Sequence, residues 1–112
     1  MPEQTFHPAG TAERWHHLSL VEQLGNIGSE VSRAGRARLA GNEDRCQLAL
    51  ARGLELFDLT LADVRWSGRR KEIARAREVV CDFFVGDNEH RSTPEELDAY
   101  FLPYAMAARR GR

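Results

Sequence analysis

Residues 65–77 carry the densest positive charge in the chain. The basic side chains there, from Arg65 to Arg77, are accompanied by a single acidic residue, Glu72, and Trp66 lies among them. Guanidinium N–H groups bind phosphate oxygens, and indole rings stack on nucleic-acid bases. This combination predicts a surface for single-stranded nucleic acid.

The C-terminal arginines join this surface if successive helices run antiparallel, because the last helix then ends where the third begins. The first helix starts at the same end and brings Trp15 close. The predicted polyanion-binding residues are therefore Arg65, Trp66, Arg69, Arg70, Lys71, Arg109 and Arg110. The alternative is that the arginines are solvated or pair with Asp58 and Asp63, while the tryptophans cap the core.

Other arrangements of reactive residues have little support in the sequence. The chain contains no G-x-x-x-x-G-K-[ST] phosphate loop, no H-E-x-x-H and no C-x-x-C. Cys46 and Cys81 are too few for a zinc or disulfide framework, so we predict two buried, reduced thiols. Asp58 and Asp63 could serve acid–base chemistry if one of them were buried. A small hydrolase is nevertheless the weakest alternative, and we predict no enzyme activity, cofactor or metal.

Small residues recur on one line of the first predicted helix. Gly25, Gly28, Ser32 and Gly35 follow steps of three and four. They lie one position along from the apolar seam of Leu20, Leu24, Ile27, Val31 and Ala34, and Glu30 is expected on the opposite side, facing water. A glycine inside a helix costs about 1 kcal/mol relative to alanine, so this glycine row indicates that another element packs closely there. That element is either another helix of the same chain or a second copy of the protein, and we predict a subunit interface at these residues.

Four segments with helical periodicity must position these residues. The first begins at the S-x-x-E capping box of Ser19 and ends at Gly41, and the second covers residues 43–63. The third follows the Ser67–Gly68 turn and ends before Gly86, and the fourth covers residues 93–110. The expected inner face of the fourth helix comprises Leu97, Tyr100, Phe101, Tyr104, Ala105 and Ala108. Pro103 should kink this helix or end it early. Short connections favour antiparallel neighbours, so we predict an all-α, up-down-up-down four-helix bundle.

Length and composition agree with one small domain. The 112 residues are 42% apolar and 29% charged, and the net charge is −1, so no polyanionic partner follows from total charge. Residues 1–18 lack an apolar core, and we predict a flexible tail there ahead of the bundle at 19–110. No stretch has the length and hydropathy of a membrane span. We expect a cytoplasmic protein without membrane contact.

Several segments resemble a known bacterial family. The stretches LSLVEQLGNIGSEVSRA, LELFDLTLADVR, KEIARAREVVCDFF and FLPYAMAAR are similar to small proteins described only as hypothetical cytosolic proteins. The resemblance covers Trp15 to Arg109 and implies no activity, cofactor or catalytic residue. In architecture alone, the chain also resembles the four-helix accessory proteins that work beside reverse transcriptases in diversity-generating retroelements.

The sequence therefore predicts a non-enzymatic helical interaction or scaffold protein. We expect it to associate with itself through the glycine row and to serve a protein partner as an accessory subunit. The alternative is a nucleic-acid-binding accessory protein, of the kind associated with reverse transcriptases, that uses the basic, tryptophan-containing end of the bundle.

Overall fold

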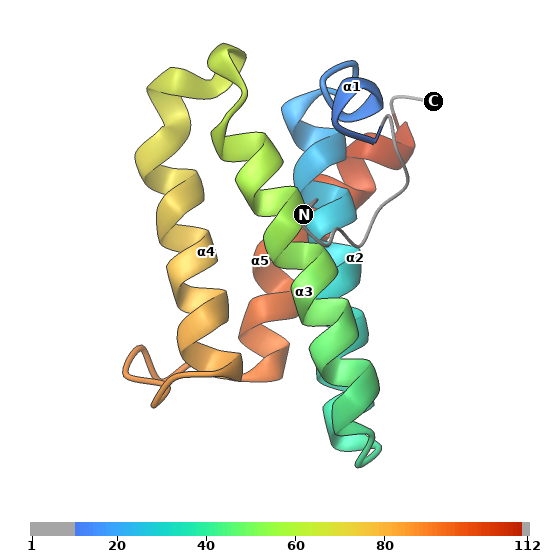
Figure 1. Ribbon diagram of the computed structural model, residues 1–112, viewed down its shortest axis with the longest axis vertical. Coiled ribbons are helices and arrows are strands. Elements are labelled where there is room, and N and C mark those ends of the chain that lie inside the picture. Colours follow the sequence, from blue (N-terminus) through green and yellow to red (C-terminus); the bar gives the residue numbers. More distant parts are fainter. Residues whose placement is uncertain (1–10, 111–112) are drawn as a thin grey trace, which may run out of the picture.

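The computed structural model describes residues 11–110, and all regular structure in this range is helical (Figure 1). The elements are α1 (Thr11–Trp15), α2 (Leu20–Leu39), α3 (Glu43–Leu61), the 3₁₀ helix η1 (Val64–Arg69), α4 (Arg70–Phe84) and α5 (Pro94–Arg110). The predicted all-α class is confirmed.

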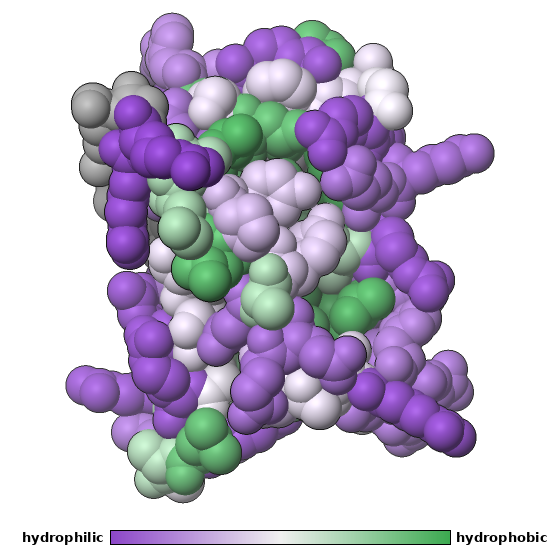
Figure 2. All heavy atoms as spheres, turned by 180° about the vertical axis from the view of Figure 1, so that it is seen from behind, coloured by the Kyte–Doolittle hydropathy of each residue, from purple (hydrophilic) through white to green (hydrophobic). Residues whose placement is uncertain are grey.

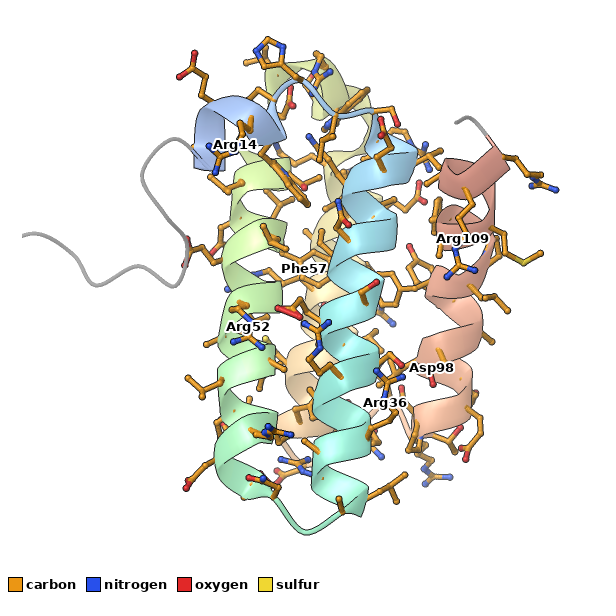
Figure 3. The ribbon with its side chains drawn as sticks, turned by 90° about the vertical axis from the view of Figure 1, so that its right-hand side faces the viewer. Arg14, Arg36, Arg52, Phe57, Asp98 and Arg109 are labelled. Atoms are coloured by element: carbon orange, nitrogen blue, oxygen red, sulfur yellow. The ribbon has the colours of Figure 1, made fainter. Side chains whose placement is uncertain are left out.

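The four long helices run alternately up and down (Figure 1). Helix α2 packs against α3 on one side and against α5 on the other, and α4 packs against α3. Figure 3 shows α2 between its two neighbours. Because α2 supports both α3 and α5, two surface grooves follow its length.

The predicted helix starts are confirmed by their caps. The backbone N–H of Glu22 donates to Ser19 Oγ at 3.1 Å, and the Glu22 carboxylate accepts from the N–H of Ser19. Thr93 and Glu96 make the same reciprocal pair at the start of α5. Gly41 follows α2 with φ of +76°, a left-handed conformation that glycine adopts without a steric penalty. These local signals therefore set where α2 and α5 begin and where the turn to α3 lies.

The predicted flexible tail is too long at its C-terminal side. Residues 1–10 lie outside the described range, but Thr11–Trp15 form α1 and residues 16–18 form a turn onto α2. Trp15 is only 5% exposed. Burying an indole ring removes a large apolar area from water, which accounts for the ordering of this short, otherwise polar segment.

The predicted apolar seams form most of the core, but several positions expected inside, most of them on α5, are not buried. The residues of α2 predicted to face inward are all buried: Leu20, Leu24, Ile27, Val31 and Ala34. On α5 only Leu97 and Phe101 are buried, whereas Tyr100, also expected inside, is 39% exposed. Since α5 packs mainly on α2, its inner face is narrow and most of its circumference reaches solvent.

Glu30 was expected to face water and is instead buried, with 7% exposure. It lies where α2 meets α3. A Cβ added at Gly53 would be 3.4 Å from Glu30 Cβ, so the glycine gives the Glu30 side chain room. Two arginines neutralise the carboxylate, Arg33 from α2 and Arg52 from α3. A buried carboxylate held by paired guanidinium groups is stable, whereas an unpaired one would not be.

Pro103 does not end α5, which continues to Arg110. The missing N–H leaves the carbonyl of Ala99 without its helical donor. Both residues are exposed, so water can satisfy that carbonyl. The expectation of an early helix end is therefore wrong.

Candidate functional site

A polar network ties together the end of the molecule where α2 begins. Trp15 Nε1 donates to Thr60 Oγ1 at 3.0 Å, and Trp66 Nε1 donates to Gln23 Oε1 at 3.0 Å. Gln23 Nε2 donates in turn to the carbonyl of Trp15 at 2.8 Å. Gln23 and Thr60 are fully buried. Both indoles therefore hold α1, α2, α3 and η1 together, as the core-capping alternative predicts.

Asp63 is the charged member of this network and is 3% exposed. Its carboxylate accepts from Arg65 Nη2 at 2.6 Å and lies 3.2 Å from His16 Nδ1. Arg65 also donates to the carbonyl of Leu18, and its guanidinium stacks over the ring of Trp66 at 4.4 Å. Arg65 and Trp66 are thus engaged within the chain.

The other residues of the predicted basic end either have partners within the chain or face solvent. Arg69 pairs with Glu72 at 2.8 Å, and Arg70 donates to the carbonyl of Leu61 at 3.1 Å. Lys71 and Arg110 are exposed, and Arg109 lines a groove between α2 and α5 (Figure 3). Of the seven predicted residues, Arg65, Trp66, Arg69 and Arg70 are therefore engaged by partners within the chain. The two acids considered for catalysis have different partners: Asp58 pairs with Arg77, whereas Asp63 pairs with Arg65.

The pKa of the Asp63 carboxyl lies far below its usual value. The hydrogen bonds from Arg65 lower this pKa most, burial opposes them, and the bond to His16 adds a smaller lowering. A carboxyl whose pKa is depressed by folding stabilises the folded state wherever the unfolded chain is also ionised. That contribution is complete above the unfolded pKa of about 3.9 and is lost as pH falls below it.

We expect Asp63→Asn to flatten the dependence of stability on pH in acid. The free energy of unfolding of the wild type should fall steeply between about pH 5 and pH 3, since the unfolded chain takes up a proton that folded Asp63 does not. Urea unfolding across this range measures the slope. Asp44→Asn, at an exposed position, is the matched control and should keep the wild-type slope. Equal slopes in Asp63→Asn and the wild type would contradict the assigned role.

The glycine row is used at the crossing of α2 and α5 within the chain. A Cβ at Gly28 would lie 2.4 Å from Phe101 Cβ, and one at Gly25 would lie 3.3 Å from Ala105 Cα. Ser32 lines the groove beside them, whereas a Cβ at Gly35 would meet nothing within 4 Å. Gly25 and Gly28 thus pack against α5 of the same chain, which was the alternative to a subunit interface. A second copy cannot pack directly against them.

Along the groove between α2 and α5, helix α5 carries a row of exposed residues that the sequence interpretation missed. Glu95, Ala99, Leu102, Met106 and Arg109 follow alternating steps of four and three and are all exposed. Leu102 is 56% exposed and Met106 is 47% exposed. Figure 2 shows pale and green side chains across the middle of the rear face, surrounded by purple polar side chains. This α5 row has the spacing of a helix–helix contact and no partner in the described chain.

A second groove, of about 580 Å³, lies between α2 and α3. Four arginines line it, Arg33 and Arg36 from α2 and Arg45 and Arg52 from α3. In the sequence each of these looks like an ordinary solvent-facing arginine on its own helix. The signal that could have found them is the Gly41 turn, which folds the two arginine-bearing segments together.

The cysteines agree only in part with expectation. Cys46 is completely buried, but Cys81 is half-buried, and both are free thiols. Burial raises the pKa of the Cys46 thiol. A thiol that is buried and protonated is a poor nucleophile, so Cys46 behaves as a small core residue.

Residues 11–110 contain neither a metal-binding cluster nor a membrane-spanning helix. No group of three histidine, cysteine or acidic side chains is placed to hold a metal ion. No helix in this range combines the length and the apolar character needed to cross a bilayer.

Comparison with known proteins adds no identification. No protein-family model, curated protein or solved structure matches the chain. The resemblance to hypothetical cytosolic proteins of bacteria therefore stays a prediction, and function has to be inferred from the two grooves and the α5 row.

Proposed function

We propose that this protein is a non-enzymatic, self-associating helical interaction protein that serves as an accessory subunit, with α5 as its contact helix. The observation that carries this proposal is the α5 row, an exposed line of apolar residues with a charged residue at each end. Exposed leucine and methionine at helical spacing gain free energy when a second helix covers them.

Charge along α5 favours a second copy as the occupant. The helix begins with Glu95 and Glu96 and ends with Arg109 and Arg110. Leu102 is the central residue of Pro94–Arg110, so an antiparallel pair of α5 helices centred there places Glu95 opposite Arg109 of the second copy. The same contact is repeated by two-fold symmetry. Antiparallel helix dipoles and the opposite charges both favour this arrangement.

This proposal moves the predicted interface from α2 to α5. Phe101 and Ala105 already cover Gly28 and Gly25, so the closest helix packing in the molecule is internal. That packing fixes α5 on α2 and turns Leu102 and Met106 outward. Gly25 and Gly28 therefore contribute to the proposed interface indirectly, because they allow α5 to pack closely on α2.

Leu102→Glu should weaken self-association by tenfold or more. Two glutamates would meet at the two-fold axis, where burying unpaired charge costs more than about 1.4 kcal/mol, the equivalent of tenfold in Kd. Sedimentation equilibrium over a range of protein concentrations measures the effect. Leu39→Glu, which changes a leucine that is 79% exposed at the end of α2, is the matched control and should associate like the wild type.

Charge exchange on α5 tests the orientation of the pair. Glu95→Arg alone places like charges together and should weaken association, whereas Glu95→Arg combined with Arg109→Glu should restore it. A wild type that stays monomeric at every concentration contradicts the proposal. Equal effects of Leu102→Glu and Leu39→Glu would contradict it as well.

A further inference from the structure

The charged residues that line the groove between α2 and α3 are all positively charged. Its charged residues are Arg33, Arg36, Arg45 and Arg52, and no carboxylate lines it within the described residues. Figure 3 shows Arg52 on α3 and Arg36 on the side of α2 toward Asp98 of α5, and Arg36 lines both this groove and the one between α2 and α5. We call the groove between α2 and α3 the arginine groove.

The buried carboxylate of Glu30 organises two of these arginines from below. Glu30 Oε2 accepts from Arg52 Nε at 2.5 Å, and Glu30 Oε1 accepts from Arg33 Nη1. Each guanidinium has five N–H donors in a fixed planar arrangement, so most donors of both side chains stay available. Pairing with Glu30 thus holds the two side chains in place at little cost in binding capacity.

The other two arginines have no carboxylate partner within the described chain. Arg36 Nη1 donates to the neutral hydroxyl of Ser32 at 3.0 Å, and the Arg45 side chain makes no hydrogen bond or ion pair with the described residues. Four guanidinium groups therefore share one buried carboxylate. Their mutual repulsion is relieved by a bound anion, and the planar fork of arginine matches phosphate geometry.

The arginines are spread along the groove. Arg45 and Arg52 are two turns apart on α3, about 10 Å along the helix axis, so successive phosphates of one chain can contact both ends of the groove. Leu48 lies between them and is 48% exposed, so it offers an apolar surface to a sugar or a base. No aromatic side chain lines the groove, which excludes base stacking there as a source of sequence preference.

We infer that the arginine groove binds the phosphodiester backbone of single-stranded nucleic acid without sequence preference. The site is separate from the basic residues 65–71, whose arginines are engaged internally. Arg33 and Arg36 also border the groove between α2 and α5, but the binding test does not depend on self-association, so either proposal can fail while the other stands.

The test measures binding of fluorescein-labelled oligothymidylate and oligouridylate by fluorescence anisotropy in low salt. The variant Arg36→Gln/Arg45→Gln removes two groove charges and leaves the Glu30 pairs intact. The matched control, Lys71→Gln/Arg110→Gln, removes two exposed positive charges outside the groove. Thermal unfolding by circular dichroism should give wild-type melting temperatures for both.

The groove variant should bind about tenfold more weakly, and its salt slope should be smaller by about 1.4, or about 0.7 for each lost phosphate contact. The control should lose less than about twofold, because distant surface charges are screened. Equal losses in both variants would overturn the inference, as would absence of wild-type binding in low salt. Anionic phospholipid vesicles or polyglutamate that bind in the same arginine-dependent way while the oligonucleotides do not would also overturn it.

Discussion

Replacing Gly28 by alanine should sharply lower the melting temperature. The new methyl group would stand 2.4 Å from Phe101 Cβ and 2.8 Å from its ring, far inside van der Waals contact. Phe101 is 4% exposed and packs edge-on against Phe57 at 6.3 Å, so it has no room to move aside. Overpacking of this kind costs about 1 to 3 kcal/mol, which corresponds to several degrees in a domain of this size.

Gly35→Ala is the matched control on the same helix. A Cβ at that position would meet nothing within 4 Å. Alanine restricts the unfolded chain more than glycine does, so this variant should be more stable than the wild type by about 0.4 to 1 kcal/mol. Thermal unfolding followed by circular dichroism compares the two. If both substitutions shift the melting temperature in the same direction, the close α2–α5 crossing is incorrect.

Trp15→Ala should have the largest effect on stability of any substitution near the N-terminus, about 3 to 5 kcal/mol. The ring is 5% exposed, and its N–H satisfies the buried hydroxyl of Thr60. Removing the ring leaves a cavity and an unpaired buried polar group, and both destabilise the folded state. Urea unfolding at neutral pH measures the loss.

Two further variants separate the causes. Trp15→Phe keeps most of the apolar surface but removes the N–H donor, so it should cost about 1 to 3 kcal/mol through Thr60 alone. His17→Ala changes an exposed neighbour and should be neutral. A wild-type unfolding midpoint for Trp15→Ala would restore the interpretation of residues 11–18 as a flexible tail.

Local sequence signals were sufficient for most of the fold. The alternating steps of the apolar residues on α2 define its buried face, and the reciprocal caps of Ser19 and Thr93 mark where two helices begin. These features depend on neighbours within one or two turns. Trp15 could not be found in this way, because one buried ring within a polar segment produces no periodic pattern.

The candidate sites were harder to predict because their contacts join distant segments. Trp66 donates to Gln23 on α2, and Arg70 donates to a carbonyl at the end of α3. These side chains of the basic segment therefore make hydrogen bonds within the chain. Glu30 appeared solvent-facing because its partner Arg52 lies on the next helix. Tyr100 matches the spacing of the inner face of α5, but α5 packs mainly on one helix, and that narrow contact leaves the ring partly exposed.

The placement of both tryptophans in one polar network has an optical consequence. Trp15 and Trp66 are the only two indoles in the chain, and both hydrogen-bond within the end where α2 begins. Intrinsic fluorescence therefore reports on the environment of that end alone. Helix α5 carries tyrosines and no tryptophan, so its detachment and unfolding lower the helical signal in far-ultraviolet circular dichroism without removing either hydrogen-bonded indole. Comparing the two spectroscopic signals during unfolding distinguishes loss of the contact helix from loss of the whole core.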